Sequence, residues 1–182
     1  KVLFTGCGSS YYLGMTVAAV ALERGLHAKA LPASQVWLAP EQALHSIEDS
    51  LLVVISRSGE TSEAVHAVER FRRLGGKAVA LLTCYPHSHL AQLADLALAV
   101  PVAQEISMTQ TRSFSSMLLA SLAFVDAIAG DGGFCARAQA LPALGQKLLG
   151  TYEPMIRELG GRLDLKRLFF LGNGPLFGLA NE

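Results

Sequence analysis

In LLVVISRSGETS, the stretch from Leu51 to Ser62, an unbroken apolar run leads directly into four hydroxyls, an arginine and a glycine. The run Leu51–Ser56 has the composition of a β-strand, and its first five side chains are all apolar, whichever face they occupy. Strands of that kind occur in parallel sheets that helices cover on both sides. The stretch therefore predicts an α/β fold in which the hydroxyl groups follow the carboxyl end of a buried strand.

The rest of the chain alternates short strand-like runs with longer helical patterns, as in sheets that are wrapped by helices. The other predicted strands of this sheet are Lys1–Thr5, His27–Leu31, Lys77–Leu82 and Leu96–Val100. The predicted helices are Tyr12–Arg24, Pro40–His45, Ser62–Leu74, Ser88–Leu93 and Ser113–Ala129. The last of these is long and mostly apolar, so it packs either in the core or at a subunit interface. Together the elements predict a doubly wound, parallel five-stranded sheet flanked by helices.

Composition changes at Gly130–Gly133, which is the best candidate for a domain boundary. Residues 1–130 are predicted to form one unit. Residues 131–165 are predicted to form a helical connection, with helices at Phe134–Leu149 and Tyr152–Leu159.

An apolar strand that leads into Gly-x-Gly occurs twice in the chain, which indicates a weak internal repeat. The first copy is Lys1–Thr5 followed by Gly6, and the second is a predicted strand at Lys166–Leu171 followed by Gly172. Residues 166–182 are therefore predicted to begin a second unit that is incomplete within the chain.

Composition excludes several classes of protein. Hydrophobic residues make up 51% of the 182 residues and charged residues 16%, which is too apolar for a disordered chain. The net charge is zero and no basic stripe with interleaved aromatic residues is present, so a nucleic-acid partner is not expected. The apolar run Met117–Val125 is shorter than a membrane span and contains Ser121, so a membrane partner is not expected either.

The cysteines and the first residues of the chain both favour a cytoplasmic location. The cysteines are odd in number and widely spaced, without a CxxC pair, which favours reduced thiols. The chain opens on a strand-like run rather than on a signal peptide. His87 and His89 lack partners at the spacing of metal ligands, so no metal site is expected.

Two turns rich in glycine and serine follow predicted strands and precede predicted helices. In the first, Gly6–Ser10, glycines let the backbone approach a ligand, and a helix N-terminus offers free N–H groups to an anion. A dinucleotide fingerprint would need a glycine in place of Tyr11 and an acid after the second strand, where Leu31–Ser34 has none. The Gly-Lys-Ser/Thr of a P-loop is absent too, so no cofactor is expected.

The second turn, Ser56–Thr61, repeats this design at the end of the central strand. Its hydroxyl and N–H groups are suited to hold a phosphate. The alternative is helix capping, with Ser58 or Thr61 as the N-cap and Glu60 in the first turn. Capping explains one or two of these residues but not the whole cluster, so anion binding is favoured.

A third polar segment, Glu105–Phe114, follows the fifth predicted strand and again precedes a helix. The carboxyl ends of parallel strands lie at one edge of a sheet, and open α/β sheets bind ligands in a crevice at that edge. The sequence therefore predicts that the three polar segments converge on one ligand site.

With GCGSS at residues 6–10, SRSGET at 56–61 and TQTRSF at 109–114, the chain resembles the sugar isomerase (SIS) domain family. That family includes phosphosugar isomerases, amino-sugar-phosphate deaminases, the isomerase half of glucosamine-6-phosphate synthase and phosphosugar-binding regulators. The resemblance covers about residues 1–128 as one SIS unit and residues 168–182 as the start of another. It implies a flavodoxin-like SIS fold.

The resemblance also implies that the ligand is a small sugar phosphate. The first turn would bind sugar hydroxyls or the phosphate, the second would hold the phosphate through its hydroxyls and through residue 57, and the third would face the sugar carbons. The implied binding residues are Ser9, Ser10, Ser56, Arg57, Ser58, Thr61, Met108 and Gln110. The synthase has glutamine, serine and lysine where this chain has Arg57, Gln110 and Arg112, which favours a relative of the synthase over the synthase itself.

The implied activity is that of a hexose 6-phosphate isomerase or an amino-sugar-phosphate isomerase or deaminase, which moves a proton between adjacent carbons. In the resembled synthase the base is a glutamate on the helix after the second unit's Gly-x-Gly turn, and it aligns beyond Glu182, so the catalytic base is expected outside this chain. Glu60 and Glu105 are the nearest acids, but helix-start or interface roles suit them better. The alternative function is a non-catalytic, regulatory phosphosugar-binding domain.

A homodimer is also expected. The apolar helix Ser113–Ala129 and the incomplete second unit would leave more hydrophobic surface exposed than a monomer tolerates.

Overall fold

The computed structural model describes residues 1–44, 46–162 and 164–182. Five parallel strands form one sheet in the order β2-β1-β3-β4-β5. The strands are β1 (Val2–Gly6), β2 (Ala28–Pro32), β3 (Leu51–Ile55), β4 (Ala78–Thr83) and β5 (Leu96–Ala99). This confirms the predicted five-stranded parallel sheet, with strand ends that differ from the predictions by a residue. The SRSGET stretch follows the middle strand of the sheet, β3.

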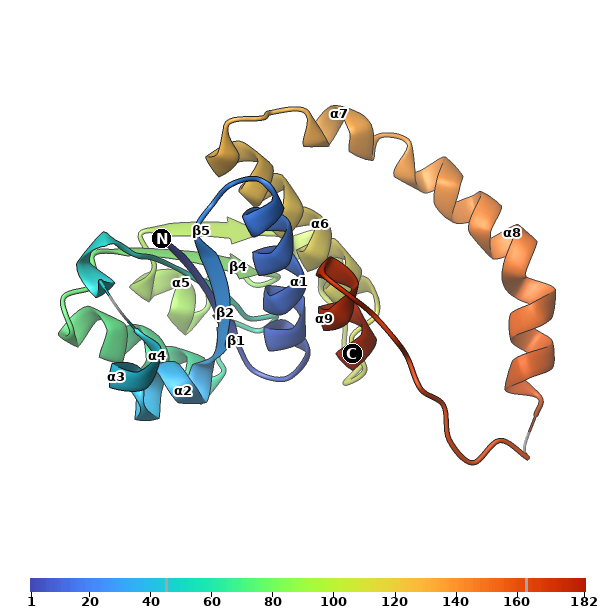
Figure 1. Cartoon of the computed structure of the whole chain (residues 1–182), viewed down its shortest axis with the longest axis horizontal. Helices are drawn as coiled ribbons and strands as arrows, with labels where there is room; N and C mark the ends of the chain where they lie inside the picture. The colour runs from blue at the N-terminus through green and yellow to red at the C-terminus, as the bar shows by residue number, and fades with distance from the viewer. Residues whose placement is uncertain (45, 163) are drawn as a thin grey trace.

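Helices cover both faces of the sheet (Figure 1). On one face, α1 (Ser9–Glu23) and α6 (Arg112–Ala129) bury strand residues such as Val53 and Ile55. On the other, α2 (Ala33–Leu38), α4 (Ser62–Arg73) and α5 (His89–Leu93) bury Leu52 and Val54. Successive residues of β3 therefore serve two separate apolar clusters, because side chains alternate across a strand.

Two short helices connect β2 to β3. α2 begins directly after β2 and was not among the predicted helices, because six residues are too few to show a helical repeat. Its buried residues Ala33 and Val36 hold it on the sheet. α3 (Pro40–Ala43) begins at the predicted proline, whereas the predicted end at His45 lies outside the described residues. One-turn 3-10 helices occur at Ile47–Asp49 and Pro101–Ala103.

α6 is 18 residues long with a mean hydropathy of 1.3, so by length and composition alone it could cross a membrane. The core helix of a globular protein passes the same test. Met117, Phe124 and Val125 of α6 are buried against the sheet. Near its C-terminal end, Asp126 accepts from Arg24, the residue that follows α1, and from Arg137 of α7 (Phe134–Ala138). These contacts pack one face of α6 on the core, whereas Leu119 and Ile128 of the helix are exposed, so the subunit-interface placement stays a prediction.

The segment after α6 is helical, but its break differs from the predicted one. The predicted helices Phe134–Leu149 and Tyr152–Leu159 are replaced by α7 and by a single helix, α8 (Leu141–Gly160). α8 carries Pro142 in its first turn, where proline is favoured, and then continues through Pro154. Interior proline removes one backbone hydrogen bond, and it bends helices as well as ending them. Figure 1 shows α8 following a bowed path away from the sheet.

The predicted strand Lys166–Leu171 is wrong: the segment is an irregular, extended stretch. A strand needs a neighbouring strand for its backbone hydrogen bonds, and none of the described residues pairs with this segment. Its apolar side chains are consequently exposed, with Phe169 80% accessible.

The Gly-x-Gly turn that follows this segment has the same backbone shape as the first one. Gly174 has φ 54° and ψ −129°, and Gly8 has φ 53° and ψ −126°. Each turn starts a helix, and the second helix, α9 (Pro175–Asn181), packs against α1 (Figure 1). The sequence repeat is therefore real in local conformation even though its strand is unpaired.

Candidate functional site

The SRSGET turn at the end of β3 is built by its own hydroxyl groups. Ser56 is only 2% exposed; its Oγ accepts a hydrogen bond from the Gly59 N–H at 3.1 Å and lies 3.3 Å from Oγ1 of Thr61. Oγ of Ser58 accepts from the Glu60 N–H at 3.2 Å. Gly59 has φ +68°, a conformation that glycine adopts without strain.

The capping alternative for this turn applies only in part. Thr61 stands at the N-cap of α4, as one version of that alternative required. Its side chain, however, makes no capping hydrogen bond to any described residue of the helix. Oγ1 of Thr61 instead lies beside Oγ of Ser56, so the first turn of α4 keeps N–H groups that no side chain caps.

The backbone of the turn directs the carbonyl groups of Arg57 and Gly59 inward. The Arg57 carbonyl accepts from the Cys84 N–H at 3.0 Å and from Oγ1 of Thr83 at 3.1 Å, and the Gly59 carbonyl accepts from the Leu90 N–H at 3.0 Å. Within the described part of the chain, the N–H groups of Arg57 and Ser58 have no acceptor. Free N–H donors without competing carbonyls are what an anion needs.

Thr83 is a residue of the site that sequence reasoning missed. Its hydroxyl ties the Arg57 carbonyl to the end of β4 and also accepts from the Tyr85 N–H at 3.2 Å. Its position just after the predicted strand Lys77–Leu82 was the available signal, because hydroxyls at the carboxyl end of a parallel strand face the same crevice.

The Arg57 side chain connects the SRSGET turn to the third polar segment. Its Nη1 donates to the Ser107 carbonyl at 2.7 Å. The sequence left open whether this guanidinium adds charge to the site or makes a surface salt bridge. No described carboxylate pairs with it. Arg57 thus holds two of the three predicted binding segments together.

Glu105 organises the start of α6. Its carboxylate accepts from the N–H groups of Thr111, Arg112 and Ser113 and from Oγ of Ser113. The Ser113 hydroxyl and these N–H groups lower the pKa of Glu105 to about 2, because they stabilise the charged form. A carboxylate with so low a pKa is a poor proton acceptor at neutral pH.

The other two predicted residues of the third segment differ in burial. The Met108 side chain is 94% exposed. Gln110 is half-buried, and its Oε1 is enclosed without a hydrogen-bond donor among the described residues. An enclosed acceptor of this kind is available to a ligand hydroxyl or amine.

The first turn, at the end of β1, is next to the SRSGET turn in the sheet because β1 pairs with β3. Ser10 is buried and Ser9 is half-buried, with the Ser10 N–H donating to the Cys7 carbonyl at 3.2 Å. Burial and the nearby Glu63 carboxylate raise the pKa of the Cys7 thiol to about 12. Cys7 is therefore a neutral thiol at physiological pH and no nucleophile.

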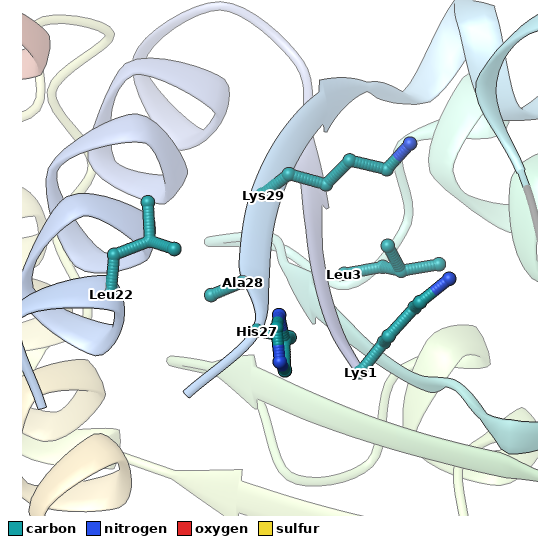
Figure 2. A pocket seen from close by; sticks show the side chains of 6 residues that line it. All are labelled: Lys1, Leu3, Leu22, His27, Ala28 and Lys29. Carbon is teal, nitrogen blue, oxygen red and sulfur yellow. The ribbon is translucent and has the colours of Figure 1, made fainter. Parts of the chain in front are cut away.

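An open hollow of about 360 Å³ adjoins the SRSGET turn on the β4 side. It is lined by Ser58, Glu60, Tyr85, Pro86, His87, Ser88 and Gln104. Figure 2 shows a different pocket, of about 210 Å³, between Leu22 of α1, the first residues of β1 and the start of β2. That second pocket lies at the amino ends of the strands, away from the three polar segments. Across residues 1–44, 46–162 and 164–182, no three His, Cys, Asp or Glu side chains are grouped to hold a metal ion.

Comparison with known sequences places these features in a family. The SIS domain family model matches residues 1–128. The chain is 28% identical, over 192 aligned residues, to glutamine–fructose-6-phosphate aminotransferase (isomerizing) of Shewanella oneidensis, and 30% identical, over 188, to the enzyme of the same name from Pyrobaculum aerophilum. Each alignment covers 100% of this chain but 31% of the relative, so the chain spans about a third of these proteins.

Solved structures give the same result. A glucosamine-6-phosphate deaminase from Thermotoga maritima superimposes with a TM-score of 0.77 at 30% identity, over 98% of this chain and 54% of that one. Tagatose-6-phosphate ketose/aldose isomerase from Escherichia coli superimposes with a TM-score of 0.83 at 23% identity, over 100% of this chain and 51% of that one, which shows a shared fold. The matched residues contain all three polar segments, and on this evidence the chain belongs to the SIS domain family.

Proposed function

We propose that this chain binds a hexose 6-phosphate or amino-hexose 6-phosphate as part of a ketose/aldose isomerase or an amino-sugar-phosphate isomerase or deaminase. The observation that carries the proposal is the SRSGET turn, where the N–H groups of Arg57 and Ser58 have no acceptor among the described residues and the carbonyls of Arg57 and Gly59 are bonded elsewhere. The three hydroxyls of Ser56, Ser58 and Thr61 surround the same turn. Such a turn replaces the water around a phosphate with fixed donors.

The remaining contacts of the sugar are assigned from the positions of the neighbouring segments. Ser9 and Ser10 follow the adjacent strand β1, and they bind sugar hydroxyls or the phosphate. The backbone at Met108 and the enclosed Oε1 of Gln110 face the sugar carbons. Arg57 fixes the distance between this segment and the phosphate through its bond to the Ser107 carbonyl. The relatives are named for fructose, glucosamine and tagatose phosphates, which is the support for a phosphosugar ligand.

The proton-transfer base is not supplied by either acid near the site. Glu105 has a pKa of about 2 and is occupied by the start of α6, and Glu60 accepts a hydrogen bond from the His89 N–H at 2.7 Å. In the proposed enzyme the base is a glutamate outside these 182 residues, on the helix of a second SIS unit. Residues 1–130 are the first unit, residues 131–165 the helical connection and residues 166–182 the start of the second.

The proposed assembly is a cytoplasmic homodimer. α8 exposes Leu144, Leu148, Met155 and Leu159, which recur at helical spacing along the helix. The three cysteines are all free thiols, which suits a reducing compartment.

Isothermal titration of the chain with fructose 6-phosphate, glucosamine 6-phosphate and unphosphorylated fructose tests the proposal. We expect binding of one or both phosphosugars and no measurable binding of fructose, since the free N–H groups recognise the phosphate. Equal heats for fructose and fructose 6-phosphate, or no heat with any phosphosugar, would contradict it.

A further inference from the structure

A carboxylate stands in the middle of the anion-binding turn, which needs an explanation. Glu60 lies between Gly59 and Thr61, and a negative charge there would repel a bound phosphate at short range. Its side chain is instead directed to the start of α5, where Oε1 accepts from the His89 N–H at 2.7 Å. His89 is the first residue of that helix, so its N–H has no partner within the helix.

The turn is joined to α5 at a second point, one residue earlier. The Gly59 carbonyl accepts from the Leu90 N–H at 3.0 Å. Gly59 also lies against Ser88, which is 3% exposed, because a side-chain carbon at position 59 would come within 2.0 Å of the Ser88 Oγ. The first residues of α5 therefore form the surface on which the SRSGET turn lies.

We propose that Glu60 is a positioning residue for phosphate binding. By bonding the His89 N–H, it clamps the turn onto α5, so that the free N–H groups of Arg57 and Ser58 keep one orientation. The same bond turns the carboxylate away from the anion. This inference rests on the proposed phosphate site and adds a role for a residue that neither binds the ligand nor moves a proton.

Two substitutions break the clamp from opposite sides. Glu60→Ala removes the acceptor. His89→Pro removes the donor, and proline is tolerated at the first position of a helix. Ser88, the preceding residue, is already extended with φ −76° and ψ 166°, as a residue before proline must be. Glu60→Gln keeps an acceptor oxygen, and His89→Ala keeps the N–H while removing the imidazole, so each serves as a matched control.

The measurement is the dissociation constant for fructose 6-phosphate, by titration calorimetry on the whole chain. We expect Glu60→Ala and His89→Pro each to weaken binding about fivefold, the size of one typical hydrogen bond. The double variant should also bind about fivefold more weakly than the unaltered chain, because either substitution alone already removes the bond between Glu60 and the His89 N–H. Glu60→Gln and His89→Ala should stay within about twofold of the unaltered chain, on the same scale.

Three outcomes would overturn the proposal. Equal losses in Glu60→Gln and Glu60→Ala would mean that an acceptor oxygen for the His89 N–H is not what the carboxylate contributes. Unaltered binding in His89→Pro would mean that the bond does not position the turn. A loss of affinity in the double variant equal to the product of the two single losses would mean that the two residues act separately.

A second readout separates this inference from the proposed function, because it needs no ligand. Hydrogen exchange by NMR should show faster exchange of the Gly59, Glu60 and Leu90 amides in Glu60→Ala and His89→Pro, but not in their controls. If the unaltered chain binds no phosphosugar and exchange still changes in this pattern, the contact between Glu60 and α5 exists and the proposed function is wrong. If exchange does not change, the clamp itself is refuted.

Discussion

At the scale of single residues, the hydroxyls of Ser58 and Thr61 can be removed without unfolding α4. Thr61 makes no capping bond to the described residues of α4, and the Ser58 Oγ accepts from the nearby Glu60 N–H and from no other described donor. We expect Ser58→Ala and Thr61→Ala each to weaken phosphosugar binding by about 1–2 kcal/mol, the scale of a lost hydrogen bond to a charged group. Titration calorimetry measures this.

A control for these variants lies on α8. The Thr151 hydroxyl donates to the Lys147 carbonyl far along the chain from the three segments, so Thr151→Ala should leave affinity unchanged. If the Ser58/Thr61 double variant binds as tightly as the Thr151→Ala chain, the phosphate is held elsewhere.

Glu105 makes stability depend on pH in an acid window. Its pKa falls from an ordinary 4.5 to about 2 in the folded chain, with the Ser113 hydroxyl as the largest cause. A depressed pKa contributes stability that is fully present above about pH 4.5 and is lost as the pH falls toward 2. Urea unfolding from pH 7 to pH 2 should show the unaltered chain more stable than Glu105→Gln at neutral pH, with the difference shrinking through this window. A difference that stays constant with pH would contradict this role.

At the scale of elements, the contact between α9 and α1 depends on a glycine. A side-chain carbon at Gly178 would lie 2.3 Å from the Tyr12 carbonyl oxygen, which is backbone and cannot move aside alone. Gly178→Ala should therefore separate α9 from α1 at a cost of about 1–3 kcal/mol, the usual range for overpacking. Hydrogen exchange should show faster exchange in α9, while the sheet keeps its protection.

Gly145→Ala is the matched comparison, since the added carbon meets no described atom within 4 Å. Alanine favours a helix over glycine by about 1 kcal/mol, so this variant should stabilise α8. If the amides of α9 exchange as slowly in Gly178→Ala as in Gly145→Ala, the α9–α1 contact is looser than the structure shows.

The elements that sequence predicted well are those whose pattern is local. The run Leu51–Ile55 is apolar on both faces, and the structure places it in the centre of the sheet. Lys166–Leu171 has a similar pattern but forms no strand, because pairing depends on a neighbour that pattern does not reveal. The break in the helical segment after α6 was also misplaced: it was predicted at residues 150–151, whereas the structure has it between α7 and α8 and continues α8 through Gly150.

At the scale of the whole molecule, exposed apolar side chains gather on α8. Besides its leucines, the helix exposes Tyr152 and Ile156, and Figure 1 shows it standing apart from the sheet. We expect two chains to associate through this helix, because a soluble monomer seldom exposes so much apolar surface. Sedimentation at micromolar concentration should give a dimer, and Leu148→Lys, which places a charge on that surface, should shift it toward monomer. A stable monomer of the unaltered chain would contradict the proposed homodimer.

The separation of binding from proton transfer is the second prediction at this scale. Because Glu60 and Glu105 are both occupied, we expect no exchange of the carbon-bound proton next to the carbonyl when these 182 residues bind fructose 6-phosphate. Solvent-deuterium incorporation followed by NMR measures it. The prediction is wrong if the unaltered chain incorporates deuterium. If Glu60→Gln or Glu105→Gln then abolishes the incorporation, the substituted glutamate is the base.

The sequence by itself determined the α/β class, the alternation of strands and helices that gives a parallel sheet, and the three polar segments that share an edge of that sheet. These features follow from local composition and from the rule that carboxyl ends of parallel strands lie together. Only the tertiary structure decided what each polar group does. It turned the carbonyls of Arg57 and Gly59 toward β4 and α5, joined Arg57 to the Ser107 carbonyl, and occupied Glu60 and Glu105. Hydrogen bonds between residues distant in the chain depend on packing, and no local pattern encodes which donor meets which acceptor.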